Sequence, residues 1–145
     1  MKRTPAPARR TPLRRVAMVR RPKIRAGEFP PAVRALLWSR FGGLCAVCWL
    51  PLPATGWTGQ HRRPRGTGGS HDPVTASVVN GLAVHELPCH RRIESDRTAA
   101  EAAGWLVRHP TDPATVPVRL PDGRRVWLEH TGSYRNHPPT GRTAA

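Results

Sequence analysis

The sequence predicts a small α+β domain, and three local patterns carry that prediction. Apolar residues recur at helical spacing over residues 30–41. Cys45 and Cys48 frame a tight turn of the kind that binds metal. Apolar and polar residues alternate on both sides of the Pro-Asp-Gly sequence at 121–123, which predicts a β-hairpin. We therefore expect an N-terminal helix, a metal-binding turn and a C-terminal hairpin in one domain, with limits at residues 28–135.

A basic arm is predicted to precede this domain, over residues 1–27. The chain holds 24 Lys and Arg against nine Asp and Glu, and residues 1–25 contain ten of those cations and no acidic residue. Such an excess favours a polyanionic partner, because each cation set against a phosphate releases condensed counterions. The alternative is a solubilising arm without a specific partner. The arm is rich in Arg, Pro and Ala and lacks hydrophobic periodicity, so we expect it to be disordered.

The sequence predicts neither a membrane partner nor a secreted protein. No window approaches the roughly 18 consecutive apolar residues that a membrane span needs. No apolar segment follows the basic N-terminus as it would in a secretory signal. The three cysteines are an odd count, which argues against a disulfide framework. We therefore expect a cytoplasmic protein whose thiols bind metal.

The first half of the domain is predicted to alternate between helix and strand. The first helix begins at Pro30-Pro31, since proline suits a first helical turn, and it ends at Gly42-Gly43. Residues 78–84 are largely apolar and predict a short strand that contains an Asn-Gly turn signal. Residues 89–103 have helical periodicity, and Gly104 ends that helix.

The second half is predicted to be mostly strand. Residues 105–107 are a short apolar run that predicts a strand. The hairpin spans residues 116–128, with Val118, Leu120, Val126 and Leu128 on one half-buried face. Residues 136–145 are rich in Pro, Gly and Thr, and we expect them to be a flexible tail.

The cysteines predict a structural zinc site. Cys45 and Cys48 have the spacing at which two thiolates of one turn bind Zn²⁺, at about 2.3 Å. A closed site needs four ligands, so Cys89 and His85 complete the predicted set. A redox pair is an alternative, although such pairs open a helix in a βαβ unit and a Pro/Gly-rich segment follows here. A second alternative is that these are core thiols without metal.

Three further residues and their neighbours resemble the HNH endonuclease family. They are His61 within Gln-His-Arg-Arg-Pro-Arg-Gly-Thr-Gly-Gly (60–69), Asn80, and His90 within Cys-His-Arg-Arg-Ile-Glu-Ser (89–95). The resemblance is to the variant with an embedded Cys-x-x-Cys knuckle, common among small bacteriophage proteins, and it covers roughly residues 30–110. It implies a ββα-metal (His-Me finger) core, in which two strands and a helix hold one divalent cation against the scissile phosphate.

The resemblance also implies a catalytic role for each of the three residues. His61 matches the general base, and an imidazole with a pKa of about 6.5 is largely neutral at cellular pH. Asn80 matches the residue that orients the loop carrying the base, and in some members it ligates the metal. His90 matches a ligand of a catalytic Mg²⁺, Mn²⁺, Ni²⁺ or Zn²⁺ ion. A cation is needed there on chemical grounds, because the charge of a phosphodiester repels nucleophiles.

Other residues extend the predicted site. Glu94 lies four residues after His90, on the same helix face, where its carboxylate would suit a hard cation; alternatively, it only complements the helix dipole. Gln60 departs from the family pattern, since many relatives carry Asp or His there as a metal ligand. The His-x-x-x-Cys spacing of His85 and Cys89 departs from a second Cys-x-x-Cys. The arginines near the two histidines match phosphate contacts, and they are Arg62, Arg63, Arg65, Arg91 and Arg92.

The expected function is therefore that of a metal-dependent DNA endonuclease, phage-encoded and acting in the host cytoplasm, that nicks or cuts duplex DNA. A homodimer would be the simplest way to cut both strands. One alternative is a zinc-stapled nucleic-acid-binding protein without activity, which Gln60 favours. The other is an accessory factor that works with phage packaging proteins and cleaves DNA only in their presence.

Overall fold

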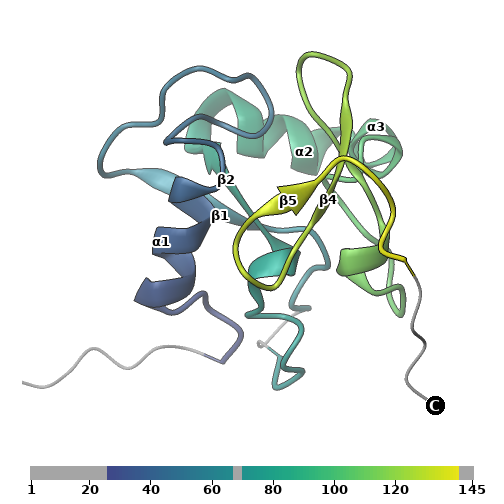
Figure 1. Cartoon of the computed structure of the whole chain (residues 1–145). Coiled ribbons are helices and arrows are strands. Elements are labelled where there is room, and N and C mark those ends of the chain that lie inside the picture. The colour runs from purple at the N-terminus through teal and green to yellow at the C-terminus, as the bar shows by residue number, and fades with distance from the viewer. Residues whose placement is uncertain (1–25, 67–69, 141–145) are drawn as a thin grey trace, which may run out of the picture.

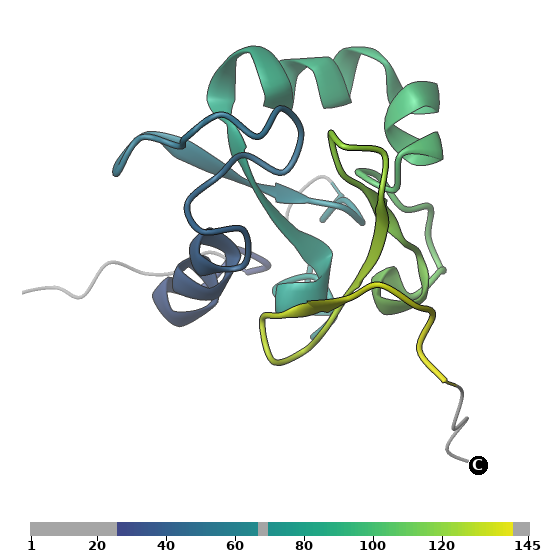
Figure 2. The ribbon, with the colours of Figure 1, turned by 45° about the horizontal axis from the view of Figure 1, so that its top comes forward.

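The computed structural model describes residues 26–66 and 70–140, which contain short helices and two small sheets (Figure 1). Most of the predicted arm and the end of the predicted tail lie outside the described residues. One sheet pairs β1 (Trp57–His61) with β2 (Gly81–His85). The other has the order β3 (Val118–Arg119), β4 (Arg125–Leu128), β5 (Tyr134–Arg135). Turning the molecule shows α1 (Pro31–Ser39) on one side of the β1–β2 pair, with α2 (Arg91–Ser95) and α3 (Arg97–Ala102) on the other (Figure 2). The α+β class predicted from the sequence is confirmed.

The predicted N-terminal helix is α1 (Pro31–Ser39). Proline occupies its first turn, where a missing backbone N–H breaks no helical hydrogen bond. Leu37 is its buried residue and packs into the core. Two glycines with positive φ, Gly42 and Gly43, follow the helix, and the Gly43 N–H donates to the Trp38 carbonyl at 3.0 Å.

Strands β1 (Trp57–His61) and β2 (Gly81–His85) pair in antiparallel register. Trp57 faces His85 at one end, and His61 faces Gly81 at the other. Each end of this pair therefore carries one histidine of functional interest. The predicted strand over 78–84 is correct only in its second half, because residues Val78–Asn80 form the 3-10 turn η1.

The predicted helix over 89–103 is wrong as a single element. A kinked segment, η2 (Glu86–His90), in which Leu87 is extended (φ −126°, ψ 136°), precedes α2 (Arg91–Ser95). The helix α3 (Arg97–Ala102) follows after a break at Asp96. The Asp96 side chain accepts a hydrogen bond from the Ala99 N–H at 3.0 Å, so it caps α3. Aspartate competes for its neighbouring backbone N–H groups in this way and so begins a helix more readily than it continues one.

The predicted hairpin consists of β3 (Val118–Arg119) and β4 (Arg125–Leu128), and that prediction is confirmed. A third strand, β5 (Tyr134–Arg135), pairs with β4 and was not predicted. The strand predicted at 105–107 is wrong. These residues are buried but belong to no strand, and the Val107 N–H donates to the Arg62 carbonyl at 2.7 Å.

One apolar core joins the two sheets and the helices. Its most buried members come from α1, η1, β2, α2 and the hairpin, and include Leu37, Val79, Leu82, Val84, Ile93, Val118 and Val126. The short 3-10 turn η3 (Pro113–Thr115) adds Pro113 to this buried set. None of the helices in the described part of the chain has the length and apolar character needed to cross a membrane.

Candidate functional site

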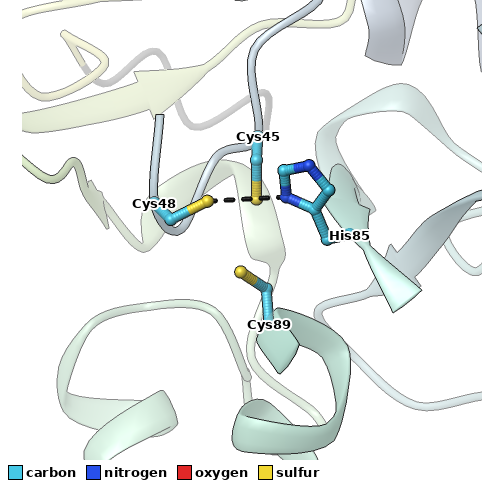
Figure 3. Close-up of side chains that lie close together, drawn as sticks. All are labelled: Cys45, Cys48, His85 and Cys89. Atoms are coloured by element: carbon cyan, nitrogen blue, oxygen red, sulfur yellow. Dashed lines mark hydrogen bonds between the residues drawn. The ribbon is translucent and has the colours of Figure 1, made fainter. Parts of the chain in front are cut away.

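Four side chains predicted to share a metal ion come together at one end of the β1–β2 pair. The Sγ atoms of Cys45, Cys48 and Cys89 and a ring nitrogen of His85 all lie within 4.8 Å of one another. Figure 3 shows the four side chains pointing toward a common centre. A tetrahedral Zn²⁺ with ligands at about 2.0–2.3 Å would place its donors roughly 3.5 Å apart. The donor set and its spacing therefore fit a bound metal ion, and the predicted grouping of these four residues is confirmed.

His85 presents one ring nitrogen to this cluster and uses the other elsewhere. Its Nδ1 lies 3.5 Å from Cys48 Sγ, while its Nε2 lies 3.1 Å from the Pro51 carbonyl oxygen. A carbonyl can only accept, so Nε2 carries the proton and the Nδ1 lone pair faces the thiols. Metal-bound histidines are commonly oriented by such a second hydrogen bond.

Backbone hydrogen bonds hold the cysteine turn in position. The Cys45 N–H donates to the Leu50 carbonyl at 3.0 Å, and the Trp49 N–H donates back to the Cys45 carbonyl at 2.9 Å. The Ala46 N–H donates to the Ala83 carbonyl at 3.0 Å, which ties the turn to β2. The turn, the end of β2 and η2 thus meet at the cluster (Figure 3).

The thiols of this cluster differ in acidity. Burial would raise the pKa of Cys45, but hydrogen bonds from the backbone of Val47, His85 and Cys48 outweigh it, and the pKa is lowered. Burial raises the pKa of Cys89 above its ordinary value, and the neighbouring thiols add to that effect.

A cleft of about 570 Å³ contains His61 and His90, the two histidines of the predicted catalytic set. His61 comes from the end of β1 and His90 from the end of η2, which are 29 positions apart in the sequence. Glu94 of α2 also lines the cleft. Ten further residues, three of them arginines, complete the lining: Glu28, Phe29, Arg34, Thr58, Gly59, Gln60, Pro64, Arg65, Arg97 and Leu106.

His61 is held by the segment that precedes α1. Its Nε2 lies 2.7 Å from the Gly27 carbonyl oxygen, and its ring stacks on Phe29 with centroids 4.0 Å apart and an interplanar angle of 13°. Burial lowers the pKa of His61 below its usual 6.5; the Gly27 hydrogen bond opposes that shift, and the charge of Arg65 adds to it. At neutral pH the ring is therefore uncharged, with Nδ1 as its proton acceptor.

His90 lies between two carboxylates on its own segment. Its Nε2 is 3.5 Å from Glu94 Oε1, and its Nδ1 is 3.7 Å from Glu86 Oε1. Glu86 in turn accepts a hydrogen bond from the Thr58 hydroxyl of β1. His90 Nε2 and the Glu94 carboxylate offer two donors to a cation, so water and substrate oxygens would complete its shell.

Asn80 is fully buried and is not among the residues that line the cleft. Its Oδ1 accepts from the Arg63 N–H at 2.6 Å, and its Nδ2 donates to the Arg63 and Thr75 carbonyls at 3.0 Å each. These three bonds fix the chain two residues after His61. Such contacts are what the orienting role expected of Asn80 would need. Both Nδ2 protons are used, and with no exposed surface the side chain does not reach the cleft to ligate a metal there.

Two of the five arginines expected to contact phosphate are placed differently. Arg62 is completely buried and donates to the carbonyls of Gly104, Val79, Pro113 and Val116 at 2.7–3.2 Å, so its assignment to a phosphate contact is wrong. Arg63 is 7% exposed and pairs with Asp72, which also removes it from the phosphate-binding set. A run of arginines in a sequence does not distinguish a surface cation from a buried one.

The other three arginines lie at the surface, and two further ones join them. Arg65, Arg91 and Arg92 are exposed, and their assignment to phosphate contacts stays a prediction. Arg34 of α1 and Arg97 of α3 line the cleft with Arg65 and were not singled out from the sequence. Arg34 is 27 positions before His61 and belongs to no motif, and Arg97 follows His90 by seven positions but lies beyond the matched segment 89–95. The packing of α1 and α3 brings both arginines to the cleft.

Gln60 is buried next to the predicted base. Its side chain is 6% exposed, lines the cleft and donates through Nε2 to the His61 carbonyl at 2.9 Å. A neutral amide oxygen is a weaker cation ligand than the carboxylate or imidazole that the family pattern has at this position.

The described residues thus hold two sites that share the η2–α2 segment, a thiol-histidine cluster and an arginine-lined cleft with two histidines. Comparison of the chain with models of known protein families, with curated proteins and with solved structures finds no match.

Proposed function

We propose that this protein is a metal-dependent endonuclease of the HNH type that hydrolyses DNA phosphodiester bonds in the arginine-lined cleft. The observation that carries the proposal is the presence of His61, His90 and Glu94 in one cleft. They come from separate elements, and each has the chemistry that phosphodiester hydrolysis needs. A ββα-metal core has two strands followed by a helix, and the chain order of β1, β2 and α2 agrees with that arrangement.

His61 would act as the general base. Its Nε2 is engaged by the Gly27 carbonyl, so Nδ1 is the nitrogen that can accept a proton from an attacking water. Because burial lowers its pKa, the ring stays neutral and basic at neutral pH. Asn80 supports this role by holding the backbone of Arg63, directly beyond the base.

His90 and Glu94 would hold a divalent cation, with Mg²⁺, Mn²⁺, Ni²⁺ and Zn²⁺ as the candidates. Their donor atoms lie 3.5 Å apart, a spacing at which one ion can bind both. When bound, such an ion supplies positive charge that stabilises the phosphorane-like transition state and the leaving oxygen. Glu86 on the other side of the His90 ring would orient it, as carboxylates do for metal-bound imidazoles.

The surrounding charge suits a nucleic-acid strand. Arg34, Arg65 and Arg97 line the cleft, and each can pair with a phosphate next to the scissile one. At the cysteine cluster we propose a structural Zn²⁺, since three thiolates and one imidazole are a common closed ligand set for that ion.

A supercoiled-plasmid assay tests the nuclease proposal. The zinc-loaded protein is incubated with plasmid and Mg²⁺, Mn²⁺ or Ni²⁺, and we expect nicked or linear DNA with at least one of these ions. His61→Ala should slow cleavage by roughly 10²–10⁴-fold, the usual contribution of a positioned general base. His137→Ala, at an exposed histidine outside the cleft, serves as the matched control and should cleave like the wild type.

Gln60 favours one second candidate, a zinc-stapled nucleic-acid-binding protein without nuclease activity. Gln60 has an amide where the family pattern has Asp or His as a metal ligand. The proposed cation is then left with two protein ligands, His90 and Glu94. Equal gel shifts for wild type and His61→Ala, with no cleavage in any of the ions, would favour this binder and contradict the enzyme.

A further inference from the structure

The segment immediately before α1 packs against the ring of His61. Gly27 and Phe29 provide two contacts of different kind, a hydrogen bond of 2.7 Å and a ring stack with centroids 4.0 Å apart. We propose that these two residues are positioning residues of the catalytic site, which fix His61 as the Nε2–H tautomer with Nδ1 directed to the reaction. The inference rests on the proposed nuclease function and deepens it.

The Gly27 contact selects the tautomer. A backbone carbonyl accepts hydrogen bonds and donates none, so the His61 Nε2 that lies 2.7 Å from it carries a proton. In a neutral ring the lone pair then belongs to Nδ1. Without this partner the two neutral tautomers would compete, and only one of them places the lone pair on Nδ1.

The Phe29 contact fixes the plane of the ring. Phe29 is 7% exposed and lies nearly parallel to His61, at an interplanar angle of 13°. Two glycines of the strand pair make room for it, because a Cβ at Gly59 or Gly81 would lie 3.0 Å from the Phe29 ring. The space for this aromatic side chain is therefore built into β1 and β2 themselves.

A side chain at Gly27 would be strained and tightly packed. Its φ is +80°, and a Cβ there would lie 3.1 Å from Arg65 Cδ, 3.2 Å from Thr75 Cγ2 and 3.3 Å from the Ser70 carbonyl. The segment thus runs through a narrow passage between His61 and the residues that follow β1. A glycine at this position is what allows the carbonyl to reach the imidazole.

This placement also connects the base to the basic arm. Arg25 is the last of the ten cations in the arm and precedes Gly27 by two positions. Two residues of extended chain span at most about 7 Å. The highly charged N-terminal part of the chain therefore joins the fold beside His61. Nucleic acid held by those cations would be tethered close to the catalytic base.

The tautomer of His61 can be measured without any nuclease assay. Long-range ¹H–¹⁵N spectra of ¹⁵N-histidine-labelled, zinc-loaded full-length protein distinguish the protonated from the unprotonated ring nitrogen, and His61→Ala assigns the signals. We expect Nε2–H and a bare Nδ1 in the wild type. In Gly27→Ala we expect averaged chemical shifts, because the two tautomers exchange. We also expect kcat to fall about tenfold with KM unchanged, since the variant loses only part of the rate enhancement that a positioned general base provides.

Gly56→Ala is the matched control. Gly56 has nearly the same φ, +84°, but a Cβ there would meet nothing within 4 Å. The two substitutions therefore introduce similar backbone strain, and only the one at Gly27 disturbs contacts around His61. We expect Gly56→Ala to leave both the tautomer and kcat at wild-type values; the same losses in both variants would overturn the inference.

Phe29→Leu provides a second test if Gly27→Ala does not fold. Loss of the stack should broaden the His61 signals and lower kcat, whereas Phe41→Leu, at a buried ring packed on Tyr134 outside the cleft, should do neither. An Nδ1–H tautomer in a wild-type protein that cleaves DNA would overturn this inference alone. An Nε2–H tautomer in a protein that cleaves with none of the ions would overturn the nuclease proposal and, with it, the catalytic role of the segment.

Discussion

Arg62 and His61 are neighbours in the sequence, yet one lies in the core and the other in the cleft. Strand β1 ends at His61, and the chain then bends at Arg62 and Arg63, which are both buried. The Arg62 guanidinium donates its hydrogen bonds to four backbone carbonyls. Burial lowers its pKa to about 9, and the nearby Arg40 charge adds to that shift. Arg62 thus remains cationic at neutral pH and links three separate segments: η1, Gly104 just after α3, and η3 with its C-cap.

Replacement of Arg62 by Met should destabilise the protein severely. The substitution keeps much of the aliphatic volume but leaves three buried carbonyls and one part-buried carbonyl without their donor, a cost of roughly 3–5 kcal/mol in the free energy of unfolding. Urea denaturation of the zinc-loaded protein measures it. Arg91→Met, at an exposed position on α2, should stay within about 0.5 kcal/mol of the wild type. A loss below about 1 kcal/mol for Arg62→Met would show that the carbonyls find water or other donors.

At the scale of elements, η2 and α2 serve both sites. Cys89 and His90 are adjacent, yet Cys89 points to the thiol cluster and His90 lines the cleft. A metal ion bound by Cys45, Cys48, His85 and Cys89 would fasten this segment to β2 and to the cysteine turn. The proposed metal ligands His90 and Glu94 would then depend on the cluster for their position, although they contribute no atom to it.

Zinc removal should therefore unfold the domain. Structural Zn²⁺ supplies roughly 10–16 kcal/mol in small zinc-binding units, as much as the net stability of a typical domain. We expect one zinc per chain by elemental analysis and loss of the cooperative thermal transition in excess chelator. His85→Ala should reduce the zinc content, whereas His130→Ala, outside the cluster, should leave it unchanged. Three thiols that alkylate freely in the native protein would contradict the site.

At the scale of the whole molecule, charge is distributed unevenly. Residues 1–25 contain ten of the 24 cations, and the remaining 120 residues carry 14 cations against nine acidic residues. Several arginines of the folded part make internal contacts: Arg40 and Arg62 donate hydrogen bonds to backbone carbonyls, and Arg63 forms an ion pair with Asp72. Most of the long-range attraction for nucleic acid should therefore come from the arm and the cleft.

Deletion of residues 1–25 should weaken DNA binding in a salt-dependent way. The slope of log affinity against log salt is expected to fall by about 0.9 for each arm cation that contacts phosphate. Fluorescence anisotropy between low and physiological salt measures this slope. Deletion of residues 141–145, which contain a single Arg, is the control. An unchanged slope after the arm deletion would identify the arm as a solubilising segment.

Local patterns in the sequence were sufficient for several parts of the structure. Prolines and glycines mark the ends of α1, the Pro-Asp-Gly turn marks the hairpin, and the spacing of Cys45, Cys48, His85 and Cys89 identifies the cluster. These features depend on backbone geometry and on ligand chemistry, which act over a few residues at a time. The break at Asp96 was missed because the helical pattern of apolar residues continues across it, whereas a cap depends on one hydrogen bond.

Only the tertiary structure decided which charged residues face solvent and what surrounds the proposed base. Arg62 and Arg65 are alike in sequence context, but the packing of several distant segments buries the first and leaves the second at the cleft. The contacts of Gly27 and Phe29 with His61 join residues more than 30 positions apart. The sequence by itself determined which side chains could do chemistry; their protonation, orientation and access depend on neighbours that come from elsewhere in the chain, because burial and hydrogen bonding are set by packing in three dimensions.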